Sequence, residues 1–157
     1  PLVGLTFTFD QFLKGDMSAN LRYNTGTTFD LNTAARNIVE AFSREISFTL
    51  DFSRKGFSIP LFGLKMQNDV DISLTYSLSK NSRKTYQVIE RHINLTGVPL
   101  DGTTRVVVEP RFRYVLSSRV TASLFYRLTK ITPDAQATRI PGSKTNEAGL
   151  DIHISIQ

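Results

Sequence analysis

The 157-residue chain contains no cysteine, which excludes a disulfide framework and any thiolate metal site. It also lacks a run of roughly 18 apolar residues, which excludes a transmembrane helix. The chain opens Pro1-Leu2-Val3-Gly4, without an initiating Met or a basic leader, so we expect any export signal to lie upstream. Its length suits one domain, residues 1–157.

Motifs that carry chemistry are also missing. The sequence has no HExxH, CxxC, GxSxG or Walker pattern, and a calcium loop around Asp69 and Asp71 would need a glycine turn and a distal Glu. The formal charge is +5, but its 19 basic and 14 acidic residues are mixed along the chain, and a nucleic-acid binder concentrates its cations. We therefore expect no enzyme, no cofactor, no metal site and no nucleic-acid partner.

Strict alternation of apolar and polar residues is the main signal that is present. Residues 46–52, 69–79 and 150–157 alternate almost perfectly, as expected of strands with one apolar and one polar face. Weaker alternation and turn residues at 14–16 and 100–102 predict about eight antiparallel strands. The other strands are expected at 3–10, 17–24, 85–95, 108–116 and 120–129.

Two stretches are expected to be long loops, residues 24–44 and 131–146. The first contains residues 32–42, the best helical candidate, which lacks a cap at its C-terminal end. We expect a loop or a strand extension there, with a short helix as the alternative. The second contains Thr132-Pro133 and Pro141-Gly142, which favour turns.

The alternation sorts side chains into two faces. Arginine in lipid costs about 2–4 kcal/mol near the midplane, so charged side chains belong on a hydrated face. The residues predicted to face a hydrated lumen are Asp10, Arg22, Asn24, Glu45, Asp51, Asp69, Asp71, Glu109, Arg111, Arg113, Arg127, Asp151 and His153. The residues predicted to face lipid are Phe48, Leu50, Ile72, Leu74, Phe112, Tyr114, Leu124, Ile152 and Ile154.

Alternation alone does not say which face meets water, because a soluble barrel buries its apolar face inside. The length of the strand at 69–79 suits a tilted membrane crossing. We also expect aromatic residues near strand ends, as in an interfacial girdle, with Tyr23, Phe52, Tyr76, Tyr114 and Tyr126 as examples. These features favour an all-β, antiparallel transmembrane barrel. A stand-alone small outer-membrane barrel and a soluble lipid-binding barrel are the alternatives.

Several stretches, taken in order, resemble one known family. They are Pro1-Leu2-Val3-Gly4-Leu5, Phe57-Ser58-Ile59-Pro60 leading into residues 67–74, Val108-Glu109-Pro110-Arg111 with the strand that follows, and Thr132-Pro133, Thr145-Asn146 and Gly149 before the final strand. Together they resemble the C-terminal region of the SprA/Sov proteins. That family forms the outer-membrane translocon of type IX secretion in Bacteroidetes and is tied to gliding motility.

The resemblance implies a role for this chain as the C-terminal sector of a much larger barrel. It places the chain in the bacterial outer membrane as the structural wall of a protein-conducting translocon. The implied partners are outer-membrane lipid, the remaining strands of the same barrel, plug or gating proteins, and secreted protein cargo. The chain ends in Ile156-Gln157, unlike outer-membrane proteins that end in an aromatic residue.

Overall fold

The computed structural model describes residues 1–12, 14–61, 64–89, 92–93, 96–134 and 141–155, which form antiparallel strands without a helix. In these ranges no helix has the length and apolarity needed to cross a membrane. The strands are β1 (Leu2–Phe12), β2 (Gly15–Asn32), β3 (Asn37–Leu61), β4 (Leu64–Ile89), β5 (His92–Ile93), β6 (Val98–Ser117), β7 (Val120–Pro133) and β8 (Ser143–Ile154).

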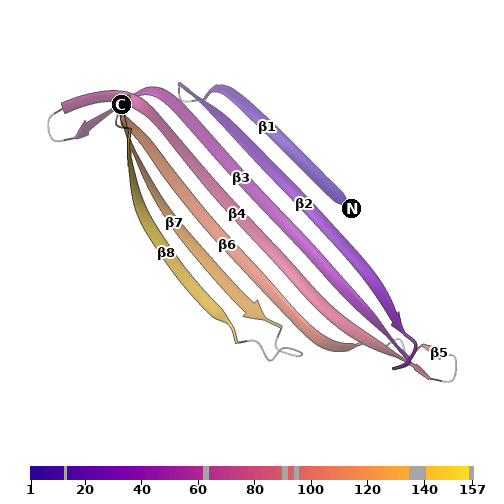
Figure 1. Ribbon diagram of the computed structural model, residues 1–157. Coiled ribbons are helices and arrows are strands. Elements are labelled where there is room, and N and C mark those ends of the chain that lie inside the picture. Colours follow the sequence, from indigo (N-terminus) through magenta and orange to yellow (C-terminus); the bar gives the residue numbers. More distant parts are fainter. Residues whose placement is uncertain (13, 62–63, 90–91, 94–95, 135–140, 156–157) are drawn as a thin grey trace.

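The strands form one open sheet in the order β1-β2-β3-β4-β6-β7-β8, and the short β5 pairs with β4 alone. Figure 1 shows the strands side by side, with hairpin turns alternating between two ends. We call the end with the β1–β2, β3–β4 and β6–β7 turns the short-turn end. The opposite end, with the connections at 90–97 and 134–142, is the long-connection end. Within the described residues, β1 and β8 each pair on one side only.

The register keeps apolar side chains beside apolar ones across the whole sheet. Leu50 lies opposite both Ala19 and Leu74, whereas the next residue, Asp51, lies opposite Ser73. Because residues opposite each other on neighbouring strands share a face, the sheet has an apolar face and a polar face. The apolar face contains an apolar band. It consists of the odd-numbered residues of 3–9 and 17–23 and the even-numbered residues of 46–52, 70–78, 106–114, 120–128 and 148–154.

The sheet is a single layer with almost no core. Among the described residues, Val70 and Tyr114 are the only buried hydrophobic side chains, while large side chains such as Phe7, Leu124 and Leu150 are exposed. The accessible surface is 11733 Å², against about 7,900 Å² for a compact soluble monomer of this mass. A soluble domain covers such a face with a second layer, but the described residues form no second layer and leave the apolar band exposed.

The structure confirms the all-β, antiparallel fold, and it corrects several expected boundaries. Residues 24–32 and 37–44 belong to β2 and β3, so the predicted loop at 24–44 is wrong. Residues 85–89 complete β4, so the separate strand predicted at 85–95 is wrong. Residues 100–102 lie inside β6, so the turn predicted there is wrong as well. Residues 90–91 and 94–95 lie outside the described residues.

The predicted loop at 131–146 is also too long, because β7 continues to Pro133 and β8 begins at Ser143. Strands continue beyond the apolar band because backbone pairing needs no particular side chain. The β2–β3 hairpin, for example, stays paired up to Asn32 and Asn37. There the Oδ1 of Asn32 accepts a hydrogen bond from the Ala35 amide at 3.0 Å, which stabilises the turn.

Candidate functional site

The polar face collects nearly all of the residues that the sequence predicted for a hydrated surface. The register puts all of them on this face except Asp10 and Asp69, which lie beside the register shifts at 9–12 and 54–57. At the second shift the Gly56 amide, with φ 65°, donates a hydrogen bond to the Oδ1 of Asp69 at 3.3 Å. The predicted grouping on one face therefore follows from the strand pairing.

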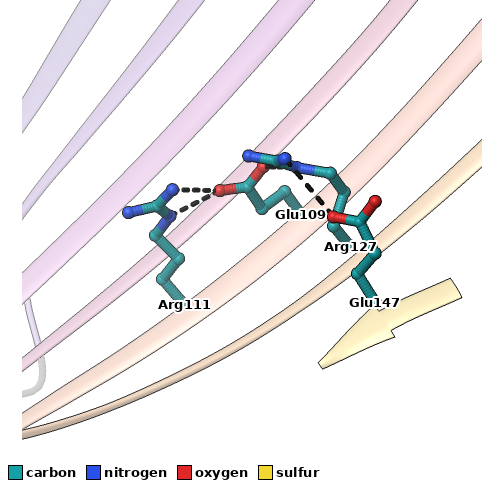
Figure 2. Close-up of polar contacts among 4 residues, drawn as sticks. All are labelled: Glu109, Arg111, Arg127 and Glu147. Carbon is teal, nitrogen blue, oxygen red and sulfur yellow. Dashed lines mark hydrogen bonds and ion pairs between the residues drawn. The ribbon is translucent and has the colours of Figure 1, made fainter. Parts of the chain in front are cut away.

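The polar face holds a chain of alternating charges across the last three strands of the sheet, β6, β7 and β8 (Figure 2). From β7, the Nε of Arg127 donates to the Oε2 of Glu109 on β6 at 2.6 Å, and the Nη1 of Arg127 lies 3.5 Å from the Oε2 of Glu147 on β8. The Nε of Arg111, also on β6, donates to the Oε1 of Glu109 at 2.5 Å. The Glu109 side chain is 12% exposed, so it is the most shielded member of this charge network.

A second group of polar contacts links β3, β4 and β6. Asp71 accepts a hydrogen bond from the Ser53 hydroxyl at 2.8 Å and lies 3.5 Å from the Nη1 of Arg113. The Asp71 and Arg113 side chains are 41% and 57% exposed, so this pair contributes little to stability. Both groups lie on the polar face, and their carboxylates contact arginine side chains.

The described part of the chain has no group of His, Cys, Asp and Glu residues that could hold a metal ion. His153 lies opposite Thr121 on the polar face. The ion pairs on this face join arginines to carboxylates, and the Ser53 hydroxyl donates to the Asp71 carboxylate.

Phe125 is a feature of the polar face that the sequence reasoning missed. It lies opposite Arg111 and Gly149, and the Arg111 guanidinium is 5.9 Å from the centre of its ring. A Cβ on Gly149 would come within 2.4 Å of the ring, so glycine leaves the space that Phe125 occupies. The signal was the run Leu124-Phe125-Tyr126, in which three successive aromatic or aliphatic residues break the alternation.

All residues predicted to face lipid lie on the apolar face. Ile72, Leu124, Ile152 and Ile154 are exposed, whereas Tyr114 is buried beside Val70. The expectation that aromatic residues lie near strand ends holds for Tyr114, three residues before the end of β6, but not for Tyr23, Phe52, Tyr76 and Tyr126. Because the strands are longer than predicted, these four lie well inside them.

Beyond the apolar band, towards the long-connection end, two more polar pairs join neighbouring strands. Arg83 on β4 donates to Asp101 on β6, and this hydrogen bond lowers the pKa of the Asp101 carboxyl. The Tyr86 hydroxyl donates to Glu40 on β3, and this hydrogen bond raises the pKa of the Tyr86 phenol. These contacts stabilise the part of the sheet that projects past the apolar band.

Comparison with protein-family models, with curated proteins and with solved structures found no match for this chain.

The charge network predicts that Glu109→Gln destabilises the sheet more than Asp151→Asn. Loss of the Glu109 charge leaves Arg111 and Arg127 beside each other without the carboxylate that joins them. Asp151 lies on the same face, opposite Ser123, and forms no ion pair with the described residues. Urea unfolding of the full-length parent polypeptide in detergent checks the order of the two midpoints, and equal midpoints would contradict a stabilising role for the network.

Proposed function

We propose that the chain is a sector of the wall of a transmembrane β-barrel in the bacterial outer membrane, and that this barrel is a protein-conducting translocon. The observation that carries the proposal is the apolar band, which crosses all the long strands on one face, opposite a charged face. In this role the chain is not an enzyme and needs no cofactor. It provides a lipid-facing surface and a hydrated inner wall.

The free energies of the two faces support this orientation. Full burial of a Leu, Ile or Phe side chain is worth about 1.5–3 kcal/mol, so a band of such residues strongly favours an apolar surrounding. Arg22, Arg111, Arg113 and Arg127 lie on the other face. Each would cost about 2–4 kcal/mol at the bilayer midplane. Lipid on the apolar face and water on the polar face satisfy both sets of side chains.

The slope of the apolar band also supports a membrane barrel. Following the register from β3 through β4, β6 and β7, Phe52 is level with Leu150 on β8. The ends of the band stay level from β1 to β3. From β3, where the band covers 46–52, to β8, where it covers 148–154, it shifts towards the short-turn end by roughly one residue per strand. With about 3.4 Å between residues and about 4.8 Å between strands, the slope is roughly 35°. Strands of membrane barrels tilt by about 35–45°, which keeps such a band parallel to the bilayer.

The two edges of the sheet favour a barrel larger than this chain. Within the described residues, β1 and β8 each have one edge without a strand partner, and lipid offers no hydrogen bonds to such an edge. A small closed barrel, whether membrane-bound or lipid-carrying, would pair β1 with β8. Strands from elsewhere in a longer polypeptide satisfy both edges in the proposed assembly.

The assignment of transport rests on the family resemblance and on the character of the polar face. The chain resembles the C-terminal region of the SprA/Sov translocons of type IX secretion, a family tied to gliding motility. A wall of paired charges with Ser and Thr offers passing cargo few apolar surfaces to which it would adhere. In this proposal, secreted proteins are the cargo, and plug or gating proteins close the pore.

Arginine substitutions on the two faces test the membrane orientation. Leu74→Arg and Ile152→Arg should block membrane insertion, because each puts a charge into lipid at a cost of about 2–4 kcal/mol near the midplane. Ser73→Arg, next to Leu74 on the opposite face, should be tolerated. The measurement is the amount of full-length parent polypeptide in the outer-membrane fraction. Equal tolerance at Ser73 and Leu74 would contradict the orientation.

A photo-crosslinking amino acid tests the transport role separately. At Thr75, on the polar face, it should capture secreted polypeptide in secreting cells, whereas at Leu74 it should capture only lipid. Immunoblots for secreted proteins provide the measurement, and secretion-blocked cells provide a control. Insertion without any cargo adduct at Thr75 would retain the barrel but reject the translocon.

A further inference from the structure

A row of cations borders the apolar band at the long-connection end. It consists of Arg44, Lys80, Lys130 and Lys144, on β3, β4, β7 and β8, and we call it the basic row. All four side chains are exposed and lie on the apolar face. On β3, β4 and β7 the cation is the first residue of this face beyond the band. On β8, Asn146 lies between the band and Lys144.

From β3 to β8 the basic row shifts in the same direction as the apolar band, by two residues against four for the band. Arg44 lies opposite Lys80, and Lys130 lies opposite Lys144. Val106 lies opposite both Leu78 and Lys130, so Lys130 is level with Leu78. The pair Lys130–Lys144 therefore lies two residues nearer the short-turn end than the pair Arg44–Lys80. This is the direction in which the band shifts from β3 to β8. The cations therefore border the band on β3, β4 and β7 and lie one residue of this face further out on β8.

The basic row differs in its partners from four of the arginines on the polar face, although Arg22 and Arg105 on that face also form no ion pair with the described residues. Arg83, Arg111, Arg113 and Arg127 each pair with a carboxylate. Over the described ranges, none of the four basic-row residues forms an ion pair. The Arg44 guanidinium lies 5.5 Å from the ring centre of Phe42, the next residue of this face away from the band. Its charge thus extends away from the apolar band, as long cationic side chains do at a membrane border.

We propose that the basic row binds the phosphate groups of anionic lipid head groups in the leaflet at the long-connection end. The inference rests on the proposed membrane orientation. Head groups begin where the apolar band ends, so four free cations at or just beyond that border meet phosphates on the lipid side of the wall. An acidic protein ligand would not require the cations to shift in the same direction as the band. In outer-membrane barrels, long loops lie outside the cell, which assigns the row to the outer leaflet.

The test compares binding of the full-length parent polypeptide, purified in detergent, to two kinds of vesicle by flotation. One is pure phosphatidylcholine, and the other contains equal amounts of phosphatidylcholine and phosphatidylglycerol. The chain should prefer the anionic vesicles. Arg44→Gln should weaken this preference about fivefold, and replacement of all four cations by Gln should weaken it by roughly several hundredfold. Circular dichroism checks that each variant keeps its strands.

Arg105→Gln is the matched control, because Arg105 lies opposite Ser79 on the polar face at nearly the same level. It should keep the preference. Equal binding of the unchanged chain to both vesicles, or an equal loss in Arg105→Gln, would overturn the inference and leave the membrane orientation intact. Competition by inorganic phosphate at constant ionic strength would show a free-anion site and overturn the assignment to lipid. Failure to insert into either vesicle would reject the proposed orientation as well.

Discussion

The structure depends on the register of its antiparallel pairs. Side chains alternate along a strand with a period of two, so a slip of one residue would move a strand's apolar side chains to the other face. Leu50 meets Ala19 and Leu74, and Leu124 meets Phe112 and Leu150, so the apolar side stays continuous through every hairpin. The two faces of the sheet are a consequence of this register.

Two unlike faces on one layer explain the unusual energetics of the chain. The sheet has a large accessible surface and, in its described part, almost no buried apolar residue. Its backbone hydrogen bonds are satisfied between strands, but its apolar band is not covered. Charges gather on the opposite face, where Glu109 joins Arg111 and Arg127. A bilayer on one side, water on the other and further strands at the edges would complete the structure.

The sequence predicted the strand type and the division into faces because alternation directly records which side of a strand each residue occupies. It did not predict the ends of the strands, since β2 and β3 continue through polar residues held by backbone pairing alone. It also did not reveal the Glu109–Arg127–Glu147 contacts or the place of Phe125 over Gly149. These depend on which residues of distant strands lie opposite each other, and alternation within one strand carries no such information.

The central claim is that the apolar face meets lipid and the polar face meets water. Because the chain lacks cysteine, single cysteines at successive positions from 71 to 77 on β4 can carry a spin label without background. In membranes, labels at 72, 74 and 76 should be reached by oxygen, which concentrates in lipid. Labels at 71, 73, 75 and 77 should be reached by a water-soluble nickel complex. Accessibility without this alternation, or with the two faces reversed, would contradict the account.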